Sequence, residues 1–375
     1  MGTVSVSWPE IHAFRLHRHH LDRPAARTKL VAVVRDTCGI QAQLPSAAEL
    51  SLRARVRGLR REDVTRALEK VRTLVRGWTV RFAVHVIPAE DFLLYTRALH
   101  ARIRRDLAWM KRRGRSAAEL EAIIQSIAEA VAKGPLTRRI LADRVASTLG
   151  ERARPWIQHG WGGRVVHAGL RGLVCFGPAR GNEITFVSRE RWLPDVRDFA
   201  PEEAAGILLR RYLRAFGPAT QQDFQRWAEI PMADVRAMWD AAEGDLIEVR
   251  VDGLTGWILE EDLPSLRRQG ASRSVVRLLP SFDTYLLGHR EKGHLVDRAH
   301  YKRVYRKAGW LSPAVLVDGR VAGVWEMDRR ANRAGIRVEP FTRLSRGVRE
   351  GIESEADDIG RFLERTAEVS VAATR

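Results

Sequence analysis

Two glutamines separated by one residue, Gln41 and Gln43, are the side chains whose type and spacing best suit chemistry. On a helix, residues i and i+2 point about 200° apart, so this pair can address one target only in an extended or helix-exit conformation. Pro45 favours that conformation because it pushes Leu44 out of the α region. A neutral amide can then orient a water through its carbonyl oxygen without being protonated. The alternative is that both amides cap or bridge backbone groups at a helix end.

Three histidines near the N-terminus, His17, His19 and His20, suggest a metal site because imidazoles are common metal ligands. They lie in an arginine-rich segment in which Asp22 is the only nearby carboxylate. We therefore expect this segment to form the basic face of a helix, and we expect no bound metal.

The spacing of the cysteines and the lack of a long apolar stretch indicate the cellular compartment of the protein. Cys38 and Cys175 are far apart and neither has a Cys-x-x-Cys partner, so the sequence predicts neither a disulfide framework nor a zinc site. No stretch reaches the roughly 18 to 20 apolar residues that a membrane span needs. We expect a cytoplasmic protein that contacts no membrane and needs no cofactor.

The charge balance points to a polyanionic partner. The chain has 375 residues, of which 45% are hydrophobic, enough for two to four compact units. Lys and Arg total 64 against 46 Asp and Glu, which gives a net charge of +18. This excess favours nucleic acid over an acidic or neutral metabolite. The alternative is an arginine-rich proteome in which surface Lys and Glu are replaced by Arg and Ala.

An approximate internal repeat organises the chain. In one copy, Gly134-Pro135 stops a helix and Thr137 is a natural N-cap for the next; a further helical turn and two short apolar runs follow. The second copy repeats helices near 203–215, 221–228 and 232–242 and ends in two strands joined by Asp252-Gly253. Three helices followed by a two-stranded hairpin are typical of a winged helix. A more divergent copy is expected at the N-terminus.

After Pro264 the pattern changes to short strands, with a hairpin marker at Asp318-Gly319 and a closing helix at 351–368. The predicted fold class is therefore α+β, with tandem winged helix-turn-helix units followed by a small antiparallel β-barrel or sheet and a C-terminal helix. The expected divisions are a winged-helix unit with the glutamines at 1–90, a basic helical connector at 91–117, winged-helix units at 118–198 and 199–264, a β-barrel-like domain with a basic hairpin at 265–345, and a C-terminal helix and tail at 346–375.

Several strings resemble one bacterial family from nearly end to end. They are Gln41-Ala42-Gln43 with Ser51-Leu52-Arg53-Ala54-Arg55, then Phe216-Gly217-Pro218-Ala219-Thr220, residues 278–288 and residues 309–325. Together they resemble the winged-helix alkylpurine DNA glycosylases typified by the azinomycin-resistance DNA glycosylase. This resemblance implies tandem winged helices that form a concave basic surface for double-stranded DNA carrying alkylated purines.

The resemblance also implies a reaction, the hydrolysis of the N-glycosidic bond of N7-alkylated purines. The same reaction could unhook interstrand crosslinks or bulky natural-product adducts. The implied roles are DNA repair and self-resistance. Because the alkylated purine is cationic, it departs as a neutral base and hardly needs a general acid. The enzyme must still position a water and stabilise an oxocarbenium-like sugar. By resemblance, Gln41 and Gln43 are the catalytic residues. A lyase step would need an amine nucleophile, and Lys29 is the closest lysine in sequence and is expected to lie turns away, so we expect a monofunctional enzyme.

The candidate DNA contacts include a departure from the family. Residues 76–85 resemble its arginine, tryptophan, arginine, glycine-threonine, histidine run, but Phe82-Ala83 replace the glycine-threonine pair, which puts the substrate range in doubt. His85 is equally well explained as a packed histidine, and the basic hairpin as a solvated face. Asp283 is expected to be a turn or cap residue. The DNA-binding candidates are Arg53, Arg55, Arg76, Trp78, Arg81, His85, Arg290, Lys302, Arg303 and Arg306.

Two other functions fit a winged-helix chain. One is a non-catalytic transcriptional regulator that reads base edges through its recognition helices, and the other is a binder of damaged or branched DNA that recruits other proteins. The chain has no heptad run for dimerisation, and linked units provide multivalency without a dimer. We expect a monomer with no obligate protein partner.

Overall fold

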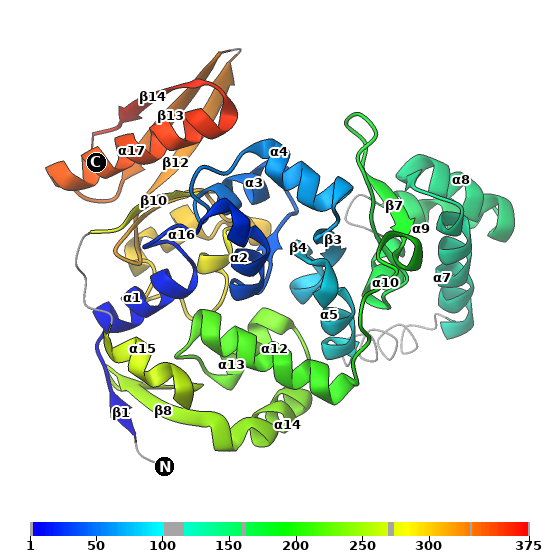
Figure 1. The fold of residues 1–375 in the computed structure, drawn as a ribbon, viewed down its shortest axis with the longest axis horizontal. Coiled ribbons are helices and arrows are strands. Elements are labelled where there is room, and N and C mark those ends of the chain that lie inside the picture. Colours follow the sequence, from blue (N-terminus) through cyan, green and yellow to red (C-terminus); the bar gives the residue numbers. More distant parts are fainter. Residues whose placement is uncertain (1–2, 101–115, 160–162, 269–273, 331, 374–375) are drawn as a thin grey trace. The chain divides into compact units, whose positions relative to one another are not determined.

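The computed structural model describes residues 3–100, 116–159, 163–268, 274–330 and 332–373, and it has the mixed α+β composition that the sequence predicts (Figure 1). The residues form two compact units. Unit 1 contains Met1–Val64, Arg210–Trp227 and Ala242–Arg375, and unit 2 contains Thr65–Leu209 and Ala228–Ala241. Each unit combines segments that are distant in the sequence. The six consecutive divisions stay a prediction, and most of the expected basic connector, residues 101–115, lies outside the described residues.

The first helix of unit 1 begins at a complete capping box. The Ser7 backbone N–H donates to the Glu10 carboxylate at 2.8 Å, and the Ser7 hydroxyl accepts from the Glu10 backbone N–H at 3.5 Å, which fixes the start of the helix. The elements of this first segment are β1 (Val4–Ser5), α1 (Trp8–Arg18), α2 (Leu30–Asp36), β2 (Ile40–Gln41), α3 (Pro45–Arg53) and the start of α4 (Arg61–Thr65).

A five-stranded sheet dominates the C-terminal part of unit 1. Its order is β10 (Val276–Leu279), β11 (Ala314–Val317), β12 (Arg320–Arg330), β13 (Arg333–Pro340) and β14 (Thr366–Val371). The pairs from β10 to β13 are antiparallel, as expected, but β14 pairs with β13 in parallel. The closing helix predicted at 351–368 lies instead at Arg346–Leu363 (α17), and residues 366–371, at its predicted end and in the tail, extend the sheet. α17 packs along this sheet (Figure 1).

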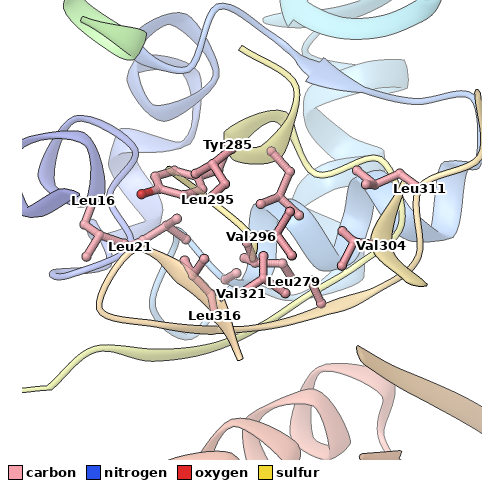
Figure 2. Close-up of a cluster of buried hydrophobic side chains, with 13 residues drawn as sticks. Leu16, Leu21, Leu279, Tyr285, Leu295, Val296, Val304, Leu311, Leu316 and Val321 are labelled. Carbon is pink, nitrogen blue, oxygen red and sulfur yellow. The ribbon is translucent and has the colours of Figure 1, made fainter. Parts of the chain in front are cut away.

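A buried hydrophobic cluster joins the end of α1 to this sheet region (Figure 2). Leu16 and Leu21 are 3% and 0% exposed, and burial of such side chains contributes about 1.5–3 kcal/mol each. They pack in one cluster with Leu279, Tyr285, Leu295, Val296, Val304, Leu311, Leu316 and Val321. The N-terminal helix is thus part of the same core as residues of β11 and β12.

Unit 1 contains a second, three-stranded sheet of order β1, β8 (Leu246–Val251) and β9 (Leu254–Leu259). β8 and β9 form the predicted hairpin, and β1 adds to it in parallel. Two of the short strands predicted after Pro264, at residues 285–287 and 304–305, are wrong. Residues 284–286 form a 3-10 turn, and Val304 ends a short helix, α16 (Tyr301–Val304). In the first case Asp283 caps the turn through Tyr285 N, so side-chain capping overrides the strand propensity of the apolar run.

Unit 2 contains an antiparallel hairpin, β3 (Leu74–Trp78) and β4 (Val84–Pro88), and a three-stranded sheet of order β5, β7, β6. The predicted cap is confirmed, because the Thr137 hydroxyl accepts from Ile140 N at 3.5 Å. The other elements of this unit are α5 (Phe92–Ala98), α7 (Ala117–Ala132), β5 (Leu136–Thr137), α8 (Arg138–Leu149), α9 (Arg154–Gln158), α10 (Val165–Leu170), β6 (Val174–Phe176), β7 (Thr185–Ser188) and α11 (Arg189–Trp192).

The repeat is visible in the order of the elements. In one copy α7, α8 and α10 precede β6 and β7; in the other α12 (Pro201–Phe216), α13 (Gln221–Ala228) and α14 (Met232–Ala242) precede β8 and β9. A last helix, α15 (Leu263–Arg268), follows β9. No helix among the described residues is both long and apolar enough to cross a membrane.

Candidate active site

The two glutamines of unit 1 lie in the segment that joins α2 to α3. At the end of α2, Cys38 and Gly39 adopt left-handed φ values of 55° and 89° and reverse the chain. Gln41 then belongs to the extended strand β2, and Leu44 has φ −112° and ψ 106°. The predicted extended conformation is confirmed, and Pro45 begins α3 as its first residue.

Side-chain exposure differs between the two glutamines. Gln41 is buried, with 9% of its surface exposed, and Gln43 is half-buried. Gln41 is the last residue of β2, and Gln43 lies in the bend that leads into α3. A pair of amides can hold one water by a donor and an acceptor at once.

Both ends of the glutamine loop are attached to residues 283–284. The Thr284 hydroxyl donates to the carbonyl oxygen of Thr37, the C-cap of α2, at 3.4 Å. On the other side, Ser51 of α3 donates to Asp283 at 2.7 Å. The same segment therefore holds the helix before the loop and the helix after it.

Asp283 is a cap residue, as predicted, and its carboxylate also pairs with Arg55. The Arg55 guanidinium donates to the two carboxylate oxygens at 2.8 and 2.7 Å, and both side chains are completely buried. Arg55 also donates to Ser51. No local sequence signal pairs two residues 228 positions apart, so the sequence analysis missed this ion pair.

The burial of Arg53 and Arg55 does not support the DNA contact expected of them. Arg53 is 3% exposed and donates to Glu355 and Asp358 of α17, at 3.0 and 2.9 Å. A guanidinium that is buried in the protein and paired with carboxylates is out of reach of a phosphate at the surface. Both arginines instead fasten α3 within unit 1.

In unit 2, the turn between β3 and β4 carries the residues that depart from the family's motif. Arg81 and Phe82 have left-handed φ values of 57° and 52°, a conformation that glycine adopts freely and other residues adopt at a cost. Phe82 is the residue at which the resemblance drawn from the sequence leads us to expect a glycine. Both residues are half-buried.

His85 follows this turn on β4 and is neutral at physiological pH. Its Nδ1 lies 3.1 Å from the carbonyl oxygen of Ala83 and 2.8 Å from the Thr79 hydroxyl, and because a carbonyl only accepts, Nδ1 carries the hydrogen. Burial, followed by the charge of Arg81, lowers the pKa of His85 to about 3. The packed, hydrogen-bonded interpretation of His85 is the one that the structure supports.

Trp78 and Arg76 also belong to the packing of unit 2. Trp78 is 4% exposed and its ring lies against Phe176 and Phe186, with centroids 4.6 and 5.9 Å apart. Arg76 lies over the Phe176 ring at 5.7 Å and donates to the carbonyl of Gly177 at 3.4 Å. The indole of Trp78 is therefore not available to contact DNA. Arg76 is half-buried, so part of its side chain reaches the surface.

Three of the basic candidates in unit 1 share one groove of about 430 Å³. It is lined by Lys302, Arg303 and Arg306 together with Trp310. Arg303 pairs with Glu339 at 3.2 Å, whereas no described residue pairs with Lys302 or Arg306. Arg290, another basic candidate of unit 1, is exposed but lies outside this groove.

The predicted basic hairpin is much smaller than expected. Instead of two strands, one antiparallel bridge joins Tyr305 to Leu311 around a tight turn, because Asp297 caps a helical turn that continues into α16. Trp310, at the end of this tight turn, is 43% exposed. In the sequence Trp310 is indistinguishable from a core residue, but exposed beside Lys302 and Arg306 it is a recognisable signal for nucleic acid.

The three N-terminal histidines do not form a common site. His17 pairs with Asp22 and His20 with Asp36, at 3.1 and 2.8 Å. His19 is completely buried and bonds to the carbonyl of Ala215, so the expected basic helix face is wrong for this residue. Among the described residues, no group of three or more His, Cys, Asp or Glu side chains could hold a metal ion.

Comparison with known proteins gives consistent matches. A model of the DNA glycosylase AlkZ-like family matches residues 34–362, a range that includes both glutamines and every candidate DNA contact. The chain is 32% identical to a Streptomyces sahachiroi protein described as an interstrand DNA cross-link repair glycosylase, over 96% of this chain and 97% of that protein. The solved structure of Streptomyces sahachiroi DNA glycosylase AlkZ is similar with a TM-score of 0.86 at 30% identity, covering 98% of this chain and 100% of that chain.

Proposed function

The chain belongs to the AlkZ-like family of DNA glycosylases, and from this premise we propose that it hydrolyses the N-glycosidic bond of N7-alkylated purines in duplex DNA. The observation that carries the proposal is the extended, partly buried loop with Gln41 and Gln43. The name of the Streptomyces sahachiroi relative supports interstrand crosslinks as part of the substrate class. The proposed roles are DNA repair in the cytoplasm and self-resistance to alkylating natural products.

The proposed reaction needs little acid catalysis. An alkyl group at N7 makes the purine cationic, so the bond from C1′ to N9 breaks with the electron pair leaving on a neutral base. A water then forms a bond to C1′, and its proton passes to solvent. Gln41 and Gln43 orient this water through their carbonyl oxygens and stabilise the cationic sugar. Neither amide titrates, so the pair works without a tuned pKa.

The proposed products are an abasic site and a free alkylpurine, because the lysine closest to the glutamines in sequence is not beside them. Lys29 precedes α2, and the whole of that helix separates it from the glutamine loop. A lyase step needs an amine at the reacting carbon. We therefore propose a monofunctional, monomeric enzyme.

For DNA binding, we propose that the two sets of three helices and a hairpin are winged-helix units, and that the N-terminal segment with the β3–β4 hairpin is a third. Arg76, Arg81 and Arg290 contact phosphates. In the groove of unit 1, Lys302, Arg303 and Arg306 bind the backbone and Trp310 stacks on a base, as exposed aromatic residues do at nucleic-acid sites. Phe82 narrows the range of lesions, because a phenyl ring replaces the family's glycine.

A test uses duplexes with one N7-methylguanine, or one crosslink through two N7 atoms, each in two unrelated sequence contexts. We expect alkali-labile abasic sites from both lesions at similar rates in both contexts. A sequence-specific footprint without any abasic product would instead identify a winged-helix regulator, which reads base edges. Binding of the damaged duplexes without turnover or a sequence preference would identify a recruiting protein.

A further inference from the structure

Unit 1 contains a basic pocket of about 190 Å³ that is lined by the C-terminal ends of three helices. Four of its described lining residues are arginines and one is a carboxylate. The lining residues are His17, Arg18 and His20 at the end of α1, Arg35 and Asp36 at the end of α2, and Arg211 and Arg214 of α12. Pockets for drug-sized ligands measure about 300–1,000 Å³, so this pocket suits one small charged group.

Helix geometry alone explains part of this clustering. Cations in the last turn of a helix interact favourably with the partial negative charge of its C-terminus. Arg18, Arg35 and Arg214 lie in the last turns of α1, α2 and α12. The helix dipole explains each cation on its own helix. It does not explain why the three ends line one pocket, where like charges repel one another.

Two of the arginines keep unused hydrogen-bond donors. Arg18 donates from Nη2 to Asp262, and Arg214 donates from Nη2 to Glu261. Neither guanidinium makes a further hydrogen bond to a described residue, although each has five N–H donors. Nε of Arg18 is buried, which leaves Nη1 as its unused accessible nitrogen. The side chains of Arg18 and Arg214 are 29% and 47% exposed, so a ligand in solvent can reach both.

The carboxylates near the pocket are already bonded to its side chains. Asp36 accepts from Nε2 of His20 at 2.8 Å, and Asp22 accepts from Nδ1 of His17 at 3.1 Å. Asp262 does not line the pocket, and its side chain is 5% exposed. These carboxylates hold the surrounding side chains in place, and the four guanidinium groups of the wall outnumber its one carboxylate.

The pocket lies close to the glutamine loop. Asp36 is the last residue of α2, and five residue steps of at most about 3.6 Å each separate it from Gln41. The Cα atoms of these two residues are therefore within about 18 Å of each other. Base pairs of duplex DNA are spaced by about 3.4 Å. A phosphate in the pocket then belongs to a nucleotide within about six positions of a base at the loop.

We propose that this pocket binds one phosphate group of the DNA backbone beside the damaged base. The inference rests on the proposed function and adds a contact that fixes the register of the duplex at the glutamine loop. Guanidinium groups suit a phosphate because its oxygens accept several N–H donors at once. The arginines of the pocket share one phosphate, whereas cations spread over an open surface each meet their own.

The first test counts the phosphates that the pocket neutralises. Arg211 and Arg214 lie three residues apart on one face of α12. The double variant Arg211→Gln/Arg214→Gln should reduce the slope of log affinity against log salt by about 1, the value of one phosphate. The matched control is Arg346→Gln/Arg361→Gln, which removes two exposed, carboxylate-paired arginines of α17 and should keep the wild-type slope. An unchanged slope in the pocket variant, or a fall of about 2, overturns the proposal.

A variant of the pocket's carboxylate has the opposite expected effect. Asp36→Asn removes negative charge from the wall and should tighten DNA binding about threefold to fivefold, the effect of one unit charge a few ångströms away in water. The control Glu353→Gln changes the net charge equally at an exposed position of α17 and should have a smaller effect. Asp36 is 47% exposed, so this variant tests the pocket even if the double arginine variant does not fold. Equal effects of the two substitutions would contradict the site.

A scan of the DNA backbone locates the phosphate. Single phosphates are replaced by neutral methylphosphonates on either side of one 7-methylguanine, whose sugar carries a 2′-fluorine that disfavours the sugar cation and prevents turnover. One replacement within about six nucleotides of the lesion should weaken binding by the wild type about tenfold, the value of a charge-assisted contact. The same replacement should have no further effect on Arg211→Gln/Arg214→Gln. If no position depends on these arginines, the pocket does not hold a backbone phosphate.

Two further measurements separate the remaining outcomes. Inorganic phosphate is titrated into the full chain without DNA, at constant ionic strength. If it saturates the wild type but not the double arginine variant, and no methylphosphonate matters, the pocket belongs to a free phosphate and the DNA assignment is wrong. The unfluorinated lesion is tested for abasic product. Product without an arginine-dependent phosphate refutes the pocket alone, and an arginine-dependent phosphate without product refutes the proposed glycosylase reaction alone.

Discussion

The guanidinium of Arg55 donates to both carboxylate oxygens of Asp283, and both side chains are completely buried. This pair connects α3 to the segment that also bonds to the end of α2 through Thr284. The glutamine loop is therefore held at both ends by residues from one distant segment. The geometry of the loop depends on packing within unit 1 and not on the loop's own sequence alone.

Removing one partner of this pair should destabilise the protein strongly. Asp283→Leu leaves a buried, unpaired guanidinium, and Arg55→Met leaves a buried carboxylate, so each should lower the free energy of unfolding by about 3–5 kcal/mol. The double variant should cost about 1–3 kcal/mol less than the sum of the two. Denaturant unfolding of all four proteins measures this coupling. Strictly additive losses would show that the two side chains do not interact in solution.

The left-handed backbone of Phe82 should have a signature in stability. Phe82→Gly removes a half-buried ring but relieves a left-handed backbone that costs a non-glycine residue about 1–3 kcal/mol. We expect the free energy of unfolding to change by no more than about 1 kcal/mol. The control Phe186→Ala, at a fully buried position, should cost about 3–5 kcal/mol. Equal losses in the two variants would contradict the strained turn.

Buried neutral histidines predict acid sensitivity. Burial, as the largest cause, lowers the pKa of His12 and His85 to about 3 and that of His167 to about 4. Because the unfolded chain binds these protons more readily, stability is fully present above about pH 6.5 and is lost as pH falls towards 4, by up to about 1.4 kcal/mol per pH unit for each group. Denaturant unfolding at pH 7.5 and 5.0 checks this. Equal stability at the two values would contradict it.

The groove of unit 1 predicts two separable effects on DNA binding. Lys302→Ala and Arg306→Ala should each reduce the slope of log affinity against log salt by about 1, because each removes one phosphate contact. Trp310→Ala should leave that slope unchanged but weaken binding, by about 1–3 kcal/mol for one stacked base. Affinities at several salt concentrations separate the two, with Arg346→Ala on the exposed face of α17 as the control. If Lys302→Ala and Arg306→Ala both keep the wild-type salt slope, this groove does not contact DNA.

How much could be predicted from the sequence depends on the range of the interactions. The extended loop was predictable because Pro45 acts on its own neighbour, Leu44, and the cap at Thr137 acts within one turn. The roles of Arg53 and Arg55 could not be predicted, because their partners lie 302 and 228 positions away in the sequence. Likewise β1 and β14 are short strands that exist only because β8 and β13 offer an edge. The exposed Trp310 needed the fold to distinguish it from a core residue.

The measurement that tests the central claim most directly is single-turnover release of free 7-methylguanine from a duplex with one lesion. Wild type is compared with Gln41→Ala and Gln43→Ala, and Gln125→Ala on the exposed surface of α7 is the control. We predict that each loop variant loses a factor on the order of 10²–10⁴ in rate, while salt-dependent DNA affinity and Tm match wild type. Variants that keep the wild-type rate, or that lose rate only together with affinity and Tm, would show that the amides are structural and would contradict the account.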